Sequence, residues 1–232
     1  IHKASTLVEA LPYIRQHSGK NIVIKYGGHA MGEAKTSKSF SQDIGLLKEV
    51  GINPIVVHGG GPQIGEMLKM KNIKSKFVKG LRVTDKQTVK VVEEVLSKDI
   101  NSKIVTDINA TGGKAFGLSG HLHNIIEAEK LEIEIKDSDS NIEKILDIGF
   151  VGKPKKINCD IINEKISKGF IPVISPLGFD KEKSVYNINA DTAAGAIAGV
   201  MKANKLLLLT DVAGILDKKN KLISSLSVND AK

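Results

Sequence analysis

The sequence contains no tryptophan and a single cysteine, and only 4% of its residues are aromatic. So few aromatic side chains argue against a surface that stacks nucleic-acid bases. One cysteine, Cys159, excludes an internal disulfide framework and fits a reducing compartment. No apolar run approaches the roughly 20 residues that span a bilayer, and the first residues contain no signal-peptide core. We therefore expect a cytoplasmic protein with no membrane partner.

Arginine is also scarce. Lysine and arginine together number 34, yet Arg15 and Arg82 are the only arginines, and the net charge is +8. The lysines are scattered along the chain, which is typical of a solvated surface and predicts no nucleic-acid partner. The positive charge favours anionic ligands. Arg82 is the more informative residue, because a guanidinium offers a planar pair of donors that lysine cannot imitate.

The chain of 232 residues is long enough for one large domain or for two lobes that share a sheet. Apolar, β-branched runs alternate with stretches of helical periodicity. This alternation predicts an α/β fold, a three-layer αβα sandwich with a mostly parallel central sheet. The expected strands are 21–26, 54–58, 115–119, 125–128, 147–157, 171–175 and 206–209, and the expected helices are 5–17, 39–50, 62–70, 84–108, 159–168 and 189–200.

Three of these segments support more detailed predictions. Thr84, followed three residues later by Gln87, resembles a capping box at the start of a long helix. The apolar segment 206–209 is typical of a fully buried strand. Residues 137–141 (DSDSN) predict a surface turn.

Signals for metal binding or for a nucleophile are weak. His121 and His123 alternate along an expected strand, but no other metal-ligand spacing accompanies them. We therefore predict no protein-bound metal. The sequence has no G-x-S-x-G elbow, and a lone Cys159 is more often inert packing than a nucleophile.

Three segments share one design, an apolar strand followed by glycines and then a helix or turn: 22–28, 55–61 and 206–214. Ligands of open α/β sheets bind beyond the carboxyl ends of the strands. Glycines there let backbone N–H groups approach an anion closely. Two such turns could hold a phosphoryl group and its acceptor from two sides. The sequence has no G-x-x-x-x-G-K-[ST] loop, and its glycine run misses G-x-G-x-x-G by one position.

Three charged residues are candidates for the chemistry. Lys25 lies in an apolar strand, so it either reaches the strand end to neutralise phosphoryl charge or lies on an edge strand with its head in water. Asp191 lies in the first turn of a helix, where a carboxylate is also a good structural cap. Arg82 either grips a carboxylate through two parallel hydrogen bonds or forms a surface ion pair with Asp85.

Taken together, these segments resemble the amino acid kinase family, and within it the members that act on N-acetyl-L-glutamate. The resemblance covers nearly the whole chain, in the family's order and spacing. The matching stretches are 7–31, 53–68, 79–85, 147–154, 186–198 and 206–217.

The resemblance implies roles for individual residues. Lys25 matches the lysine that stabilises the transferring phosphoryl group, and Asp191 matches the aspartate that orients the catalytic lysines. Gly27 and Gly28 match the glycines whose amides contact the phosphoryl group. Three residues fall in the nucleotide-binding stretch, namely Thr210, Asp211 and Leu216.

The acceptor side is implied in the same way. Gly60 and Gly61 match the turn that holds the acylated amino acid. Arg82 matches the arginine that grips its α-carboxylate, and Asn187 matches a further substrate contact. The implied reaction is in-line attack by the side-chain carboxylate of N-acetyl-L-glutamate on the γ-phosphate of ATP, with Mg²⁺ carried by the nucleotide. A carboxylate is already ionised at pH 7, so positioning and charge neutralisation suffice and no general base is needed. His29 and His58 are then expected to be structural.

The resemblance also implies organisation and regulation. Residues 1–20 would form an N-terminal oligomerisation helix, residues 21–180 a substrate lobe, and residues 181–232 the start of an ATP lobe. The N-terminal helix resembles that of arginine-inhibited homohexamers in arginine biosynthesis, and a signal-transducing partner protein is a further implication. The family continues with a second catalytic lysine, so we expect this chain to be incomplete. The rival readings are a sibling kinase for another acidic amino acid and a non-catalytic amino-acid-sensing subunit.

Overall fold

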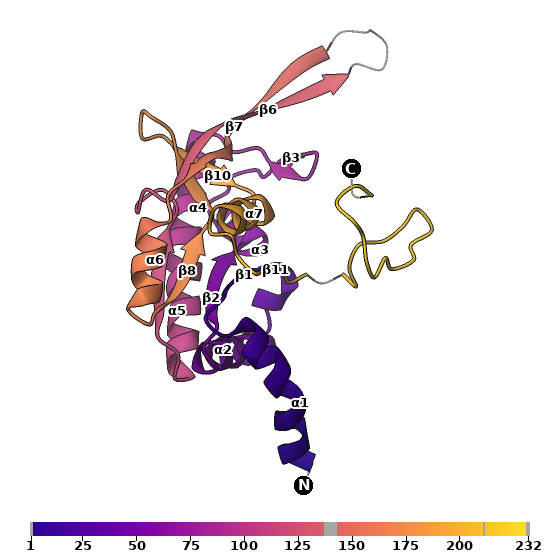
Figure 1. The fold of residues 1–232 in the computed structure, drawn as a ribbon. Helices are drawn as coiled ribbons and strands as arrows, with labels where there is room; N and C mark the ends of the chain where they lie inside the picture. The colour runs from indigo at the N-terminus through magenta and orange to yellow at the C-terminus, as the bar shows by residue number, and fades with distance from the viewer. Residues whose placement is uncertain (1, 137–142, 211, 231–232) are drawn as a thin grey trace.

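The computed structural model describes residues 2–136, 143–210 and 212–230. Helices cover both faces of a central sheet (Figure 1), which confirms the predicted αβα sandwich. No helix in the described ranges is long and apolar enough to span a bilayer. The predicted turn at 137–141 lies outside the described residues.

The central sheet is parallel throughout, with strand order β11-β1-β2-β8-β5. Parallel strands need crossover connections, and here helices supply them, as the alternating sequence pattern predicts. The strands are β1 (Asn21–Tyr26), β2 (Asn53–His58), β5 (Ala115–Ser119), β8 (Ile171–Ser175) and β11 (Lys205–Leu208).

Strand β1 shows why both faces of the sheet are covered. Ile22 and Ile24 point into a core formed with one helical layer, whereas Val23 points into a second core on the opposite face. Successive side chains of a strand alternate between faces, so a nearly continuous apolar run satisfies both layers. The first layer comprises α2 (Ala34–Glu49), α3 (Gly61–Met70), α4 (Lys86–Glu94), the π-helical segment η2 (Val95–Ile100) and α5 (Asn101–Ala110); the second comprises α6 (Asp160–Ser167) and α7 (Ala190–Val200).

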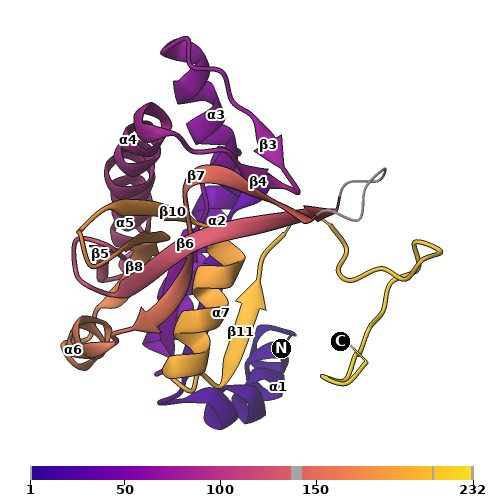
Figure 2. The ribbon, with the colours of Figure 1, turned by 90° about the horizontal axis from the view of Figure 1, so that it is seen from above.

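A second, small sheet closes on itself beside α7. Its strands are β6 (Ile126–Lys136), β7 (Glu143–Ile157), β9 (Leu177–Phe179) and β10 (Val185–Ile188). The antiparallel pair β6–β7 extends away from the body (Figure 1), and Figure 2 shows it crossing over α7. The expected strand at 125–128 was therefore too short, and β9 and β10 were not predicted. A further short hairpin, β3 (Phe77–Val78) and β4 (Leu81–Arg82), lies near α3.

The N-terminal helix α1 (His2–His17) confirms the prediction for 5–17 and extends away from the body at the opposite end from β6–β7 (Figure 1). Beyond β11 the chain leaves the body as an irregular segment. β11 lies at the sheet edge, where Leu206, Leu207 and Leu208 are 37%, 39% and 49% exposed. The prediction of a fully buried strand was therefore wrong, because among the described residues β11 has a neighbour on only one side.

Two local predictions were also wrong. The helix expected from Thr84 begins with Asp85 as its N-cap, whose carboxylate accepts hydrogen bonds from the backbone N–H groups of Gln87 and Thr88. His121 and His123 lie in a turn after β5, not on a strand. His121 is held there by Ser119 and Glu93, so it packs as a structural residue.

Candidate active site

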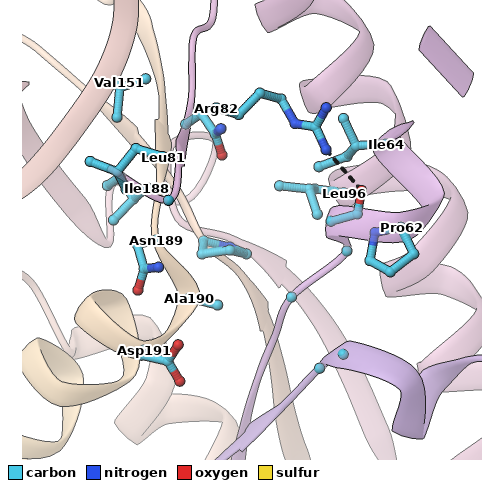
Figure 3. Close-up of a pocket in the computed structure, with 18 of the residues that line it drawn as sticks. Pro62, Ile64, Leu81, Arg82, Leu96, Val151, Ile188, Asn189, Ala190 and Asp191 are labelled. Atoms are coloured by element: carbon cyan, nitrogen blue, oxygen red, sulfur yellow. Dashed lines mark hydrogen bonds between the residues drawn. The ribbon is translucent and has the colours of Figure 1, made fainter. Parts of the chain in front are cut away.

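A cavity of about 270 Å³ opens where strands β1 and β2 end. This is the edge of a parallel sheet at which ligands bind. The walls come from the two glycine turns, the hairpin β3–β4 and the start of α7 (Figure 3). The residues predicted from the sequence that line it are Lys25, Gly27, Gly28, Gly60, Gly61, Arg82, Asn187 and Asp191.

Lys25 lies on β1 between two neighbouring strands, so the edge-strand alternative does not apply. Its side chain is 14% exposed, and Nζ lies 3.2 Å from Oδ1 of Asp191. Asp191 projects from the first turn of α7 and is 47% exposed. Because Asn189 caps this helix, Asp191 is not the cap and its carboxylate is free to pair with the lysine. The mostly buried ammonium of Lys25, next to an open cavity, is suited to bind an anion that enters the cavity.

The two glycine turns lie against each other. The backbone N–H of Gly59 donates to the carbonyl of Tyr26 over 2.7 Å, so the β1–β2 pairing continues into both turns. A Cβ on Gly27 would lie 3.2 Å from Cε of Lys25, so a side chain at this position would crowd the lysine. Gly28 has a φ of +68°, a conformation that favours glycine.

Gly60 is packed on the side away from solvent. A Cβ there would lie 2.4 Å from Cδ1 of Ile100 and 2.7 Å from Cδ2 of Leu96, far inside contact distance. Gly61 has open space at the same position. The turn therefore presents its backbone to the cavity while the helix behind it fixes its place.

Arg82 is buried at the far end of the cavity from Asp191 (Figure 3). Nη2 donates to the carbonyl of Gly61 over 2.9 Å, Nη1 donates to Oγ of Ser75, and the guanidinium carbon lies 4.7 Å from the ring centre of Phe77. Burial lowers the pKa of Arg82, but an arginine stays protonated in proteins. The alternative ion pair with Asp85 is wrong, since Asp85 caps α4.

Asn187 lies on β10, and its side-chain amide donates to Oγ1 of Thr84 over 3.5 Å. Sequence reasoning missed two other polar or aromatic lining residues, Phe77 and Asn189. An Asn just before a helical run is an N-cap signal, which would have identified Asn189. Phe77 carried no signal, because only the hairpin pairing brings it opposite Arg82.

The predicted nucleotide-binding stretch lies outside this cavity. The backbone N–H of Leu209 donates to the carbonyl of Lys25 over 3.0 Å, so Thr210 follows directly beside the end of β1. Leu216 is further along the irregular segment, exposed and bridged to Leu222. Asp211 lies outside the described residues.

His58 ends strand β2 and is fully buried. Desolvation lowers its pKa from 6.5 to about 4, so the ring is neutral at pH 7. Nδ1 is 2.9 Å from the carbonyl of Gly59 and Nε2 is 3.2 Å from Nδ2 of Asn101, which fits a ring that donates from Nδ1 and accepts at Nε2. Within the described ranges, no three His, Cys, Asp or Glu side chains gather in a group that could hold a metal ion.

Known proteins match this chain over most of its length. The sequence model of the amino acid kinase family matches residues 20–232. Acetylglutamate kinase of Rhodospirillum centenum is 54% identical over 99% of this chain and 75% of its own length, and that of Rhodospirillum rubrum is 55% identical over 100% and 75%. A solved N-acetylglutamate synthase from Neisseria gonorrhoeae, complexed with coenzyme A and N-acetyl-glutamate, has a TM-score of 0.79 at 25% identity, covering 98% of this chain and 50% of that one.

The parallel sheet, the paired glycine turns and these matches agree. The chain belongs to the amino acid kinase family, and within it to the acetylglutamate kinases.

Proposed function

We propose that this protein transfers the γ-phosphoryl group of ATP to the side-chain carboxylate of N-acetyl-L-glutamate, as the acetylglutamate kinases among its relatives are named for doing. A carboxylate oxygen forms the new bond to phosphorus, the bond from phosphorus to the bridging oxygen of ADP breaks, and N-acetyl-L-glutamyl 5-phosphate and ADP result. The attacking carboxylate is ionised at pH 7, so no proton has to be removed.

The observation that carries the proposal is the placement of two cationic side chains in one small cavity. Arg82 lies at the end opposite Asp191, and Lys25 lies beside Asp191. A substrate with two carboxylates fits such a site: one pairs with the guanidinium, and the other lies near the ammonium, where transfer occurs. Glycine backbone N–H groups of the turns supply further donors between them.

We assign each residue a separate task. Lys25 neutralises charge that moves onto the phosphoryl oxygens, and Asp191 orients Lys25. Gly27 and Gly28 let the backbone approach the phosphoryl group, while Gly60 and Gly61 hold the acyl amino acid. Asn187 and Asn189 line the acceptor side. Oδ1 of Asn189 caps α7 and Nδ2 of Asn187 donates to Thr84, so we assign the substrate to Nδ2 of Asn189 and Oδ1 of Asn187.

We assign the nucleotide to the region beside the end of β11. Thr210 lies there next to the backbone of Lys25, and Asp211 and Leu216 follow in sequence. Mg²⁺ would be carried by the ATP phosphates rather than by a protein cage. The donors around the site are the ammonium of Lys25 and the backbone N–H groups of the glycine turns. They fit an anionic phosphate chain, because glycines carry no side chain that would block its approach to the backbone.

We further propose regulation and assembly on the lines the N-terminal helix suggests. α1 exposes Val8 and Leu11, which are three residues apart and therefore share one face of the helix, and we propose that this apolar face packs against a second copy in a homohexamer. We propose arginine as the feedback inhibitor and a signal-transducing protein as a further partner. We also propose a division into two lobes at residue 180, with β11 of the second lobe completing the sheet of the first.

The test measures ADP release from Mg-ATP by the full-length protein with N-acetyl-L-glutamate, free glutamate, aspartate and N-acetylaminoadipate as acceptors. We expect turnover with N-acetyl-L-glutamate and its loss in Lys25→Ala. Turnover with another acceptor alone would keep the fold and overturn the substrate. ATP binding without any turnover would instead indicate an amino-acid-sensing subunit.

A further inference from the structure

His58 lies directly beneath the second glycine turn and takes no part in the reaction proposed above. Its side chain is fully buried. Val56, two residues earlier on β2, points into the core of the first helical layer, so His58 points to the same side of the sheet. A polar ring buried there has to find partners, and each of its two nitrogens has one.

The two partners determine which nitrogen of the ring carries the hydrogen. Nδ1 is 2.9 Å from the carbonyl oxygen of Gly59, which can only accept, so Nδ1 is the donor. Nε2 faces Nδ2 of Asn101 over 3.2 Å. That amide nitrogen also donates to the carbonyls of Leu118 and Val173, over 3.3 Å and 3.0 Å. The amide therefore cannot turn its oxygen toward the ring, because carbonyl oxygens would then face one another, and Nε2 is left as an acceptor.

The hydrogen bond from His58 sets the direction of the peptide group that joins Gly59 to Gly60. The C=O and the N–H of a trans peptide point to opposite sides. The carbonyl of Gly59 points toward the ring, on the side of the first helical layer, so the N–H of Gly60 points toward the other face of the sheet. Lys25 is on that face, since it follows Val23 of the second core by two residues.

The N–H of Gly60 is available to a ligand. Gly60 lines the cavity, and its N–H donates to no other group in the part of the chain that the structure describes. Ile100 and Leu96 close the opposite side of this residue, where a Cβ would lie within 2.7 Å of either side chain. The donor therefore faces the space that the substrates occupy.

A run of three glycines does not hold such a peptide by itself. Glycine populates regions of backbone conformation that other residues avoid, so a glycine peptide turns over at little cost. The carbonyl of Gly59 accepts no hydrogen bond other than the one from His58 among the residues described. Without that bond the peptide could rotate and present a carbonyl oxygen, instead of an N–H, to an anionic substrate.

We propose that His58, oriented by Asn101, is a positioning residue that turns the N–H of Gly60 into the cavity, where it donates to the side-chain carboxylate of the acceptor. This role rests on the proposed function, because it assigns that N–H to an oxygen of N-acetyl-L-glutamate. It adds a neutral donor to the two cations of the site. A donor fixed before the substrate arrives needs no reordering during the reaction.

A crystal structure of the unmodified full-length protein with N-acetyl-L-glutamate and a non-hydrolysable ATP analogue tests the placement directly. We expect an oxygen of the side-chain carboxylate about 2.7–3.2 Å from the backbone nitrogen of Gly60, with the carbonyl of Gly59 still on Nδ1 of His58. A substrate bound beyond reach of this N–H, or a carbonyl turned away from the ring, would overturn the inference alone. Failure to bind N-acetyl-L-glutamate would overturn the proposed function, and the inference with it.

Two substitutions separate the donor from the packing of the ring. His58→Leu fills much of the same space without a donor, whereas His58→Asn places an amide nitrogen where Nδ1 was, since both atoms are two bonds from Cβ. Both variants lose the contact with Asn101, so both should melt at a lower temperature. We expect His58→Leu to raise the KM for N-acetyl-L-glutamate about tenfold or more, the usual value of one hydrogen bond to a charged group. His58→Asn should restore most of this loss, and the KM for ATP should change little in either variant.

His123→Leu is the matched control. Nδ1 of His123 is 3.0 Å from the backbone nitrogen of Ser119, so this ring also contacts a turn, but it does not line the cavity. We expect this variant to lose stability with no change in the KM for N-acetyl-L-glutamate. A purely structural role of His58 would lower kcat through the folded fraction and leave both KM values unchanged. That result, or equal KM values in folded His58→Leu and His58→Asn, would overturn the inference; if neither variant folds, the crystal structure decides.

Discussion

Lys25 and Asp191 form an ion pair across the candidate active site, with 3.2 Å between Nζ and Oδ1. Lys25 lies on the face of β1 that the second helical layer covers, and Asp191 lies in the first turn of α7, a helix of that layer. The ion pair therefore also joins the sheet to a covering helix. The lysine is the more buried partner. Its ammonium is therefore oriented before any ligand arrives, and positioning of this kind raises the rate of phosphoryl transfer.

Lys25→Ala and Asp191→Asn should separate the two roles. We expect the alanine variant to lower kcat by about 10²–10³, because a charge that stabilises the transition state is lost. The asparagine variant should lower kcat less, since the ammonium remains but is no longer oriented. Steady-state ADP release measures both. Asp43→Asn, a change at an exposed position of α2, serves as the control. Unchanged kcat in Lys25→Ala would remove this lysine from the mechanism.

The two neighbouring glycines of the β2 turn should respond differently to alanine. At Gly60 a Cβ would collide with Ile100 and Leu96, so we expect Gly60→Ala to cost about 1–3 kcal/mol of unfolding free energy and to displace the turn. At Gly61 a Cβ meets open space, so Gly61→Ala should fold normally and mainly raise KM by narrowing the cavity. Urea unfolding and steady-state kinetics test the pair. Equal stability of the two variants would contradict this packing.

Much of the fold was predictable because the spacing of apolar residues along the sequence follows which side chains are buried. The alternation along β1 and the apolar β8 are dictated by two covered faces, and the strand boundaries at 21–26, 115–119 and 171–175 were confirmed. Helix α1 was likewise evident from its spacing, and the continuous helical run from α4 to α5 was expected apart from its π-helical centre.

The remainder depended on contacts that sequence spacing does not encode. Leu206 to Leu208 have the composition of a buried strand, yet their exposure is set by what lies beside the sheet edge. Arg82 could be singled out for its chemistry, but its contacts with Gly61 and Phe77 arise only when the β3–β4 hairpin forms. The length of β6–β7 was missed although β6 alternates apolar and charged residues from Leu131 to Ile135, a pattern that is itself a strand signal.

Protonation of His58 should make the protein less stable in mild acid. Burial lowers its pKa from 6.5 in the unfolded chain to about 4 when folded. Between these values the unfolded state binds the extra proton, so stability is complete above pH 6.5 and falls as the pH drops toward 4. The loss amounts to about 1.4 kcal/mol per pH unit, or about 2 kcal/mol between pH 6.5 and pH 5. Urea midpoints at pH 7.5 and 5.0 measure it.

His58→Gln removes the titrating group and should flatten this pH dependence, although the variant itself is less stable. Burial also lowers the pKa of His121, which adds a loss in the same direction. His121→Gln therefore measures that second share separately. An equally steep pH dependence in His58→Gln would show that a different group is responsible.

Arg82→Lys tests whether geometry or charge alone holds the acceptor. Lysine keeps the positive charge but cannot form two parallel hydrogen bonds to a carboxylate, and it cannot stack in the same plane on Phe77. We expect the KM for N-acetyl-L-glutamate to rise about tenfold or more with a smaller change in kcat, because the lost contact precedes transfer. Arg15→Lys, at the only other arginine and on an exposed face of α1, is the matched control. Phe77→Leu should give a milder rise in KM, since the guanidinium keeps its bonds to Ser75 and Gly61. If kcat alone fell in Arg82→Lys, the arginine would act on the phosphoryl group rather than on the acceptor carboxylate.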